Sequence, residues 1–319
     1  MRVGVIFPGQ GSQTVGMGAD VARTYPAAAQ CFAAAKTILG YDLLDLCERG
    51  PVDVLTETRY AQPAIFVTNV ALARAAGDAL QPVISAGHSF GEFCSLTLAG
   101  ALSFETALSL VNQRGLAMHR AATTARGAMS AVLGLDPGAL RAAVARAVES
   151  GAGRVQLANF NAPGQIVISG DADAVRVAGE YAAEAGAKRV VPLNVSGAWH
   201  STLMDPARAE FEPHVRAAVV MPPRFTVISN VDAKPYDDVE TIKTNLVRSV
   251  TEEVLWHDVA LAIVAAGLDL IVECGASPVL ATMFKRIEGA PKAITVSDAG
   301  GVEKLRAQLA DASAEPAAR

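Results

Sequence analysis

A serine placed between two glycines is the residue of this chain best suited to do chemistry. Ser89 lies in the segment Gly87-His88-Ser89-Phe90-Gly91, which follows a short apolar run and precedes a run that favours a helix. In the order strand, sharp turn, helix, the two glycines let the backbone crowd together, and the turn holds the serine hydroxyl exposed. A hydroxyl held in this way can attack an acyl group. We therefore predict that Ser89 is the nucleophile of acyl chemistry.

A general base must accept the proton of this serine, and histidine is the usual one. Of the five histidines, His200 follows directly after a predicted strand in a turn of small residues, where α/β folds place catalytic side chains. His119 and His214 lie in helical patterns and are expected at the surface, and His257 begins a predicted helix. We predict that His200 is the base and that His88 supports the turn or the bound acyl group. The alternative for His200 is a loop histidine without a partner. The alternative for the serine motif is a chance match, since the chain has 27 glycines.

Arg114 is the third residue to consider. It lies in an otherwise apolar and small stretch of a predicted helix. A surface arginine is the default interpretation, but a buried one needs an anionic partner, and its planar fork of donors fits a carboxylate with two parallel hydrogen bonds. In that case the substrate would carry both a reactive acyl group and a free carboxylate.

Alternating strands and helices must position these three residues. Short apolar runs predict buried strands, and amphipathic or alanine-rich stretches predict the helices between them. The predicted strands are 2–7, 82–86, 225–229 and 268–273, and the predicted helices are 18–39, 60–77, 91–100, 103–122, 254–266 and 277–287. This alternation is typical of a mostly parallel sheet with helices on its faces.

The middle of the chain has a different order of elements. Strands are predicted at 128–133, 155–160, 165–169 and 189–195, and helices at 136–149 and 171–185. The order βαββαβ is that of a ferredoxin-like unit. We expect such a subdomain at 126–195, inserted into an α/β body made of 1–125 and 196–319.

The composition limits the possible partners. The chain has 319 residues, 51% of them hydrophobic, and a net charge of −5, so it has no basic excess with which to bind nucleic acid. Its four cysteines show no metal-ligand spacing, which favours buried free thiols in a reducing compartment. No apolar run is long enough to span a bilayer, and the first one is too short for a secretory signal. We expect a cytoplasmic protein without a metal site.

These pieces together resemble a known family. The chain is similar to the malonyl-CoA:acyl carrier protein transacylases and to the discrete, trans-acting acyltransferases of polyketide synthases, from Val5 to about Arg286. The motifs that carry the resemblance are Phe7-Pro8-Gly9-Gln10-Gly11-Ser12-Gln13, Gln62-Pro63-Ala64, Gly87-His88-Ser89-Phe90-Gly91-Glu92, Arg114-Gly115, Gly127-Ala128-Met129, Asn159-Phe160-Asn161-Ala162-Pro163-Gly164-Gln165, Gly197-Ala198-Trp199-His200-Ser201 and Glu273-Cys274-Gly275. The resemblance implies an α/β-hydrolase-like body with an inserted ferredoxin-like subdomain.

The resemblance also implies the reaction. Ser89 would attack the thioester of an acyl-CoA while His200 takes its proton, and the N–H groups of Gln10 and Phe90 would form the oxyanion hole. Arg114 would bind the distal carboxylate of a malonyl-type group. The ester on the serine would then pass to the phosphopantetheine thiol of an acyl carrier protein, in fatty acid or polyketide biosynthesis, with ping-pong kinetics.

The remaining site residues follow from the same resemblance. His88, Met129, Asn159 and Trp199 are expected to contact the substrate. A backbone carbonyl, assigned to Ser249, is expected to orient the catalytic histidine. Coenzyme A enters as part of the substrate, no bound cofactor is expected, and the protein is expected to be a monomer.

Two segments depart from the family pattern. The stretch 249–256 differs from the usual Q-L-x-x-P-V-x-W, which puts the shape of the loop near the histidine in doubt. Trp199 stands where malonyl-specific members usually carry phenylalanine, and its bulk should disfavour branched acyl groups. The alternatives to malonyl transfer are a serine hydrolase or thioesterase, a transferase for an unusual extender unit, and a noncatalytic protein that docks carrier domains.

Overall fold

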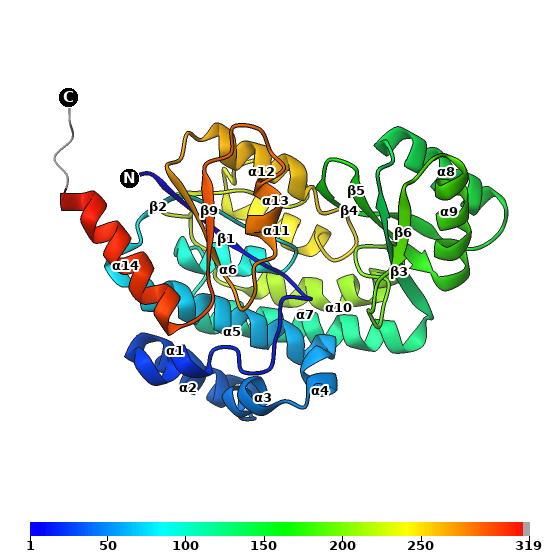
Figure 1. The fold of residues 1–319 in the computed structure, drawn as a ribbon. Coiled ribbons are helices and arrows are strands. Elements are labelled where there is room, and N and C mark those ends of the chain that lie inside the picture. Colours follow the sequence, from blue (N-terminus) through cyan, green and yellow to red (C-terminus); the bar gives the residue numbers. More distant parts are fainter. Residues whose placement is uncertain (315–319) are drawn as a thin grey trace.

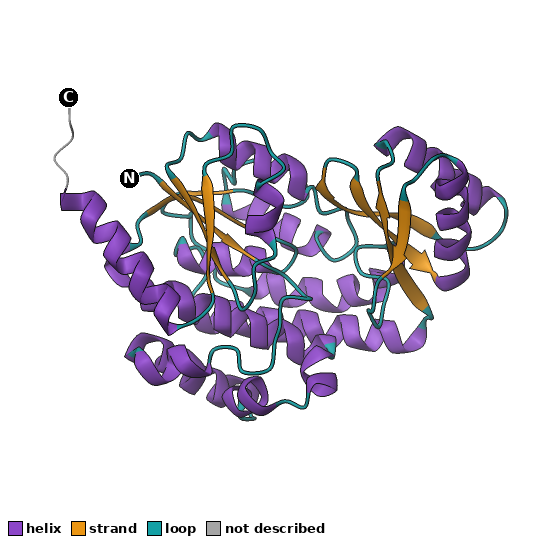
Figure 2. Ribbon diagram, in the orientation of Figure 1, coloured by secondary structure: helices purple, strands orange, loops and turns teal. Residues whose placement is uncertain are grey.

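Two β-sheets organise the chain and lie in separate parts of the molecule (Figures 1 and 2). The computed structural model describes residues 1–314. The first sheet is parallel, with the strand order β7-β2-β1-β8-β9. Its strands are β1 (Val3–Phe7), β2 (Pro82–Gly87), β7 (Thr226–Val227), β8 (Leu270–Cys274) and β9 (Lys292–Val296). The predicted α/β body with a mostly parallel sheet is confirmed.

Helices cover both faces of this sheet, so its central strand is apolar on both sides. In β1, Val3, Val5 and Phe7 enter the hydrophobic cluster that contains α5, α6 and α7, while Ile6 enters the cluster that contains α12 and α13. The helices of the body are α1 (Ala19–Thr24), α2 (Pro26–Leu39), α3 (Leu43–Arg49), α4 (Val52–Thr56), α5 (Thr58–Ala76), α6 (Gly91–Leu98), α7 (Phe104–Thr124), α10 (Asp205–Ala217), α11 (Val239–Arg248), α12 (Trp256–Ala265), α13 (Leu280–Phe284) and α14 (Ala299–Ala314), with 3₁₀ turns η1 (Gly77–Ala79) and η2 (Thr202–Met204).

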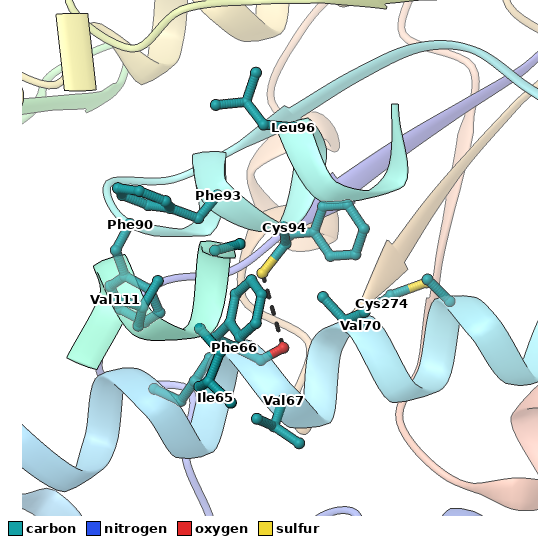
Figure 3. Close-up of a cluster of buried hydrophobic side chains, with 14 of the residues drawn as sticks. Ile65, Phe66, Val67, Val70, Phe90, Phe93, Cys94, Leu96, Val111 and Cys274 are labelled. Atoms are coloured by element: carbon teal, nitrogen blue, oxygen red, sulfur yellow. Dashed lines mark hydrogen bonds between the residues drawn. The ribbon is translucent and has the colours of Figure 1, made fainter. Parts of the chain in front are cut away.

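Helix α5 is the centre of the larger core, and it is buried on nearly all sides. Figure 3 shows how α6, which follows the predicted serine turn, packs across it. Cys94 of α6 lies near Phe66 and Val70 of α5, and the Cys94 thiol lies 4.0 Å from the carbonyl of Phe66 (Figure 3). The helix that begins at the serine turn therefore rests on a helix that is buried on nearly all sides.

The second sheet is antiparallel, with the order β4-β5-β3-β6. We call this sheet and its two helices the small subdomain. It consists of β3 (Gly127–Leu133), α8 (Pro137–Glu149), β4 (Val155–Ala162), β5 (Gln165–Asp171), α9 (Ala172–Glu184) and β6 (Arg189–Pro192). Helices α8 and α9 cover one face and form a core of their own with it, whereas Met129 and Val167 on the other face pack with the body. The predicted βαββαβ order is confirmed, and the division of the chain at residues 126 and 195 stays a prediction.

Some elements were not predicted. These are α3, α4, α10, α11, β9 and α14, and the predicted strand at 225–229 is reduced to the two residues of β7. Helices α3 and α4 are short, and β9 is a partly exposed strand at the edge of the sheet, so each has a weak apolar pattern. Within residues 1–314, no helix is both long and apolar enough to cross a membrane.

Candidate active site

The serine turn has the predicted geometry. Ser89 follows β2 and precedes α6. Its φ of 54° lies in the left-handed region, which residues other than glycine rarely adopt. The flanking glycines are required by close packing: a Cβ on Gly87 would lie 2.0 Å from the backbone of Gly91, and a Cβ on Gly91 would lie 2.6 Å from the carbonyl oxygen of Phe7. The turn is therefore strained and compact, and it carries Ser89 at its apex.

Asn230 holds this turn from the opposite side, a contact that the sequence did not reveal. The backbone N–H of Ser89 donates to Asn230 Oδ1 at 3.0 Å. The amide of Asn230 in turn donates to the carbonyl of Gly87 at 2.7 Å and to Glu92 Oε2 at 2.6 Å. The hydroxyl of Tyr236 donates to the other oxygen of Glu92. Burial raises the pKa of Glu92 to about 7, against the opposing effect of these two donors.

Ser89 and His200 form the expected pair. The Ser89 hydroxyl lies 2.8 Å from His200 Nε2. On the other side of the ring, His200 Nδ1 lies 3.2 Å from the carbonyl oxygen of Glu252, which accepts a hydrogen bond when Nδ1 carries the proton. The carbonyl of Ser249, the predicted orienting group, raises the pKa of His200, as the carbonyl of Glu252 does. The hydrogen bond at Nδ1 nevertheless goes to Glu252. This contact leaves Nε2 free to accept the serine proton.

The surroundings of His200 keep its ring neutral. Burial, the positive charge of Arg114 and the neighbouring His88 together lower the pKa of His200 to about 3. The imidazole is only 4% exposed. A neutral histidine can act as a base at neutral pH, so the electrostatics agree with the geometry.

Arg114 is buried beside the serine with part of its donor set unused. Its Nη1 donates to Gln62 Oε1 at 2.9 Å and its Nη2 to Ser89 Oγ at 3.4 Å, while Nε has no partner. Within residues 1–314 no carboxylate forms an ion pair with it, although it is only 1% exposed. Burial lowers the pKa of Arg114 to about 10, and the charge of Glu92 opposes that shift. A buried guanidinium in this state lacks the anion that would compensate its charge.

A cavity of about 200 Å³ brings the predicted residues together. Its lining includes all of the predicted substrate-contacting and oxyanion residues: Gln10, His88, Ser89, Phe90, Arg114, Met129, Asn159, Trp199 and His200. The side chain of Gln10 is fixed by a hydrogen bond from Nε2 to Thr58 Oγ1 at 3.0 Å. Within the described chain, no hydrogen bond engages the backbone N–H of Gln10 or that of Phe90. Two backbone donors near Ser89 are therefore available to a ligand.

His88 joins the turn to the small subdomain. Its Nε2 lies 2.9 Å from Asn161 Oδ1, and its ring contacts Trp256 with ring centroids 5.6 Å apart. Burial lowers the pKa of His88. These contacts join the serine turn to its surroundings, and the role of His88 stays a prediction. His119, predicted at the surface, lines a second pocket beside Gln10.

Sequence reasoning missed four residues of the site. Gln62 and Asn161 belong to motifs that were noted, so their place in those motifs was a usable signal. The carbonyl of Glu252 lies in the stretch 249–256, which was expected to orient the histidine through Ser249, whereas Asn230 comes from a segment without such a signal. Within residues 1–314, no cluster of side chains has the composition of a metal site.

Comparison with known proteins gives the family. The model of the family described as "Acyl transferase domain" matches residues 5–309. The malonyl CoA-acyl carrier protein transacylase of Haemophilus influenzae is 40% identical over 300 residues, which cover 93% of this chain and 96% of that protein. The transacylase of Bacillus subtilis with the same name is 39% identical over 303 residues, covering 95% of each chain.

Solved structures agree with these relatives. An acyl carrier protein S-malonyltransferase from Vibrio cholerae aligns with a TM-score of 0.91 at 39% identity, over 96% of this chain and all of that one. A malonyl-transacylase solved in complex with a type II polyketide synthase carrier protein aligns with a TM-score of 0.91 at 36% identity, over 97% of this chain and all of that one. The chain therefore belongs to the acyl transferase family, among the malonyl-CoA:acyl carrier protein transacylases.

Proposed function

We propose that this enzyme moves a malonyl group from coenzyme A to the phosphopantetheine thiol of an acyl carrier protein through an ester on Ser89. The observation that carries the proposal is the buried Arg114, which has an unpaired donor and lies 3.4 Å from the serine hydroxyl. A malonyl thioester brings a carboxylate two carbon atoms beyond its reactive carbonyl. That carboxylate supplies the anion that Arg114 lacks.

The first half-reaction forms the ester. His200 Nε2 takes the proton of Ser89 while Oγ attacks the thioester carbonyl, and the N–H groups of Gln10 and Phe90 bind the oxygen that becomes negative. The intermediate collapses when the carbon–sulfur bond breaks, and His200 returns the proton to the sulfur of coenzyme A. The second half-reaction runs the same steps in reverse with the thiol of the carrier protein as nucleophile.

The charge of the substrate also prepares the base. Arg114 lowers the pKa of His200 in the free enzyme. A carboxylate bound to Arg114 offsets this positive charge, so the pKa of His200 rises when the substrate binds. The base becomes stronger when a malonyl group is in place, which favours malonyl over acetyl in the chemical step as well as in binding.

The carrier protein is expected to approach the cleft between the body and the small subdomain. For contact with an acidic surface of the carrier protein we propose the basic residues Lys188, Arg189, Lys285 and Arg286. Arg286 Nη1 donates to Gln165 Oε1 at 3.1 Å, which joins the body to the β4–β5 turn. The relative solved with its carrier protein supports such a complex.

Substrate choice within the cavity is proposed to favour the unbranched group. Trp199 is 6% exposed and lines the cavity next to His200. Its ring leaves little room for a methyl branch on the malonyl carbon, a discrimination worth about 1–3 kcal/mol.

We also propose that the enzyme acts as a monomer in the cytoplasm without a bound cofactor. Sedimentation of the purified protein tests whether it is a monomer.

Intact-protein mass spectrometry tests the proposal directly. After brief incubation with malonyl-CoA, wild-type protein should gain the mass of one malonyl group, and Ser89→Ala should gain none. Methylmalonyl-CoA and acetyl-CoA should label less. Release of malonate at the same rate with and without carrier protein would instead identify a hydrolase. Absence of any adduct in wild type would remove the transferase scheme.

A further inference from the structure

The small subdomain contacts the loop that carries His200, through one side chain. Gln156 of β4 donates from Nε2 to the carbonyl of His200 at 3.4 Å and to the carbonyl of Thr251 at 3.2 Å. Its Oε1 accepts from the backbone N–H of Thr202 at 3.0 Å. One amide therefore joins the segment 200–202, which carries the base, to the segment 251–254, which carries the carbonyl that orients it.

Strand β4 also binds the orienting segment by its backbone. The N–H of Val254 donates to the carbonyl of Ala158, and the N–H of Phe160 donates to the carbonyl of Val254, both at 2.8 Å. Glu252, whose carbonyl faces His200 Nδ1, lies between the contacts at Thr251 and Val254. Both flanks of the orienting carbonyl are thus attached to the small subdomain, in addition to the hydrogen bonds that Thr251 and Leu255 make to the body at Arg248 and Asn230.

The backbone at His200 needs this support. Its φ of 57° is unfavourable for a residue with a side chain, and such a conformation persists only when surrounding contacts over-determine it. Gln156 binds the carbonyl of His200 and the N–H two residues later, so it fixes the peptide groups on the C-terminal side of the strained residue.

We propose that Gln156 is a positioning residue, through which the small subdomain holds the His200 imidazole against Ser89. The inference rests on the roles proposed above for Ser89 and His200. It makes the small subdomain part of the proton-transfer machinery as well as a wall of the substrate cleft. A shift of β4 relative to the body would move the base and its orienting carbonyl together.

The variants Gln156→Met and Gln156→Glu test this role. Methionine keeps the length of the side chain and removes all three hydrogen bonds, whereas glutamate keeps an acceptor for Thr202 and loses the donor to the two carbonyls. A matched control is Arg141→Met, because Arg141 of α8 also joins the small subdomain to the orienting segment, by an ion pair with Glu253 at 3.1 Å, and does not touch His200. Thermal unfolding of each variant shows that it is folded.

The measured quantity is the rate at which a fluorophosphonate labels Ser89, since this reagent needs the serine–histidine pair but not Arg114. We expect labelling, and the rate constant of acylation by saturating malonyl-CoA, to slow about tenfold or more in both Gln156 variants. The dissociation constant for malonyl-CoA should stay within about twofold of wild type, and Arg141→Met should keep the wild-type rates.

Two results would overturn the inference. Labelling of folded Gln156 variants at the wild-type rate would show that the amide does not position the base. An equal loss of rate in Arg141→Met would show that weakening any contact between the small subdomain and the orienting segment slows the reaction, so that Gln156 has no specific role. Failure of wild-type protein to label at all would remove the proposed roles of Ser89 and His200 as well, so the two levels of the proposal are separable.

Discussion

At the scale of single residues, the site depends on a positive charge that the protein buries without a counter-ion. Arg114 is bound by the neutral groups of Gln62 and Ser89 and by no carboxylate within residues 1–314. Such a charge is costly in the free protein, and the cost is recovered when a carboxylated ligand binds. In the proposed mechanism the guanidinium selects the acyl group, and together with burial of the ring it keeps the adjacent histidine neutral until that group arrives.

Replacement of Arg114 should change selectivity between acyl groups. We expect Arg114→Ala to lower the rate of labelling by malonyl-CoA by about 100-fold or more, because truncating one partner of a buried charge pair costs about 2–5 kcal/mol. Labelling by acetyl-CoA should stay the same or rise. Arg120→Ala is the control on the same helix, since Arg120 pairs with Glu210 at the surface. Equal losses for both acyl groups would show that Arg114 does not bind the carboxylate.

The pH dependence of Ser89 reactivity should report the pKa of His200. An ordinary histidine would lose half of its base form near pH 6.5, whereas the pKa of His200 is lowered to about 3. The rate of fluorophosphonate labelling should therefore stay nearly constant as the pH falls from 8 to about 5. In Arg114→Gln the acid limb should move to higher pH, because a positive charge near the ring is lost. An acid limb centred at pH 6.5 in wild type would contradict the buried, neutral base.

At the scale of elements, the serine turn could be predicted because all of its requirements are local. An apolar strand, two glycines at fixed spacing and a helix-forming run lie within one short segment, and steric crowding alone demands glycine at Gly87 and Gly91. The residues that complete the site are distant in sequence. Asn230 lies 141 positions from Ser89, and Glu252 lies 52 positions from His200. Neither the hydrophobic periodicity nor the helix and strand propensities of the sequence indicate that the carbonyl of Glu252 will contact the ring of His200.

The same contrast applies to the small subdomain. Its βαββαβ order follows from apolar alternation within about 70 residues, and that order was predicted. Its attachment to the orienting segment at Val254 depends on how β4 meets a loop from another part of the chain. The edge strand β9 was missed because a half-exposed strand leaves a weak apolar pattern, whereas β7 was predicted at 225–229 and is shorter than predicted.

The close packing of the serine turn predicts a sharp difference between two glycines. Gly87→Ala should destabilise the protein by about 2 kcal/mol or more and slow the labelling of Ser89, because its Cβ would meet backbone atoms 2.0 Å away. Gly300→Ala in α14 is the matched control: the nearest atom is 3.6 Å away, and alanine favours a helix. Chemical denaturation measures both variants. If Gly87→Ala were as stable and reactive as wild type, the turn would not be packed in this way.

At the scale of the whole molecule, the carboxyl group of Glu92 is buried at the start of α6, directly after the serine turn. Glu92 is 1% exposed, and it accepts hydrogen bonds from Asn230 and Tyr236 of a segment more than 130 residues away. The group thus ties the start of α6 to the segment that follows β7. Because burial raises the pKa of Glu92 from 4.5 to about 7, its ionisation couples the folding of the whole chain to pH.

The direction of that coupling follows from proton counting. Between pH 4.5 and about 7 the folded protein keeps a proton on Glu92 that the unfolded chain has released. The contribution of Glu92 to stability is therefore complete below pH 4.5 and is lost as the pH rises to about 7. His200 acts in the opposite sense: its lowered pKa means that the unfolded chain binds the extra proton, so its contribution is lost as the pH falls from 6.5 toward 3.

Glu92→Gln isolates the first effect, since His200 titrates equally in wild type and variant. We expect the free energy of unfolding of Glu92→Gln, relative to wild type, to increase by about 3 kcal/mol as the pH rises from 4.5 to 7.5. Urea denaturation across this range measures it. Tyr236→Phe should extend the decline of wild-type stability to higher pH, because it removes a donor that favours the ionised carboxylate. Parallel pH curves for wild type and Glu92→Gln would mean that Glu92 ionises in the folded protein as it does in the unfolded chain.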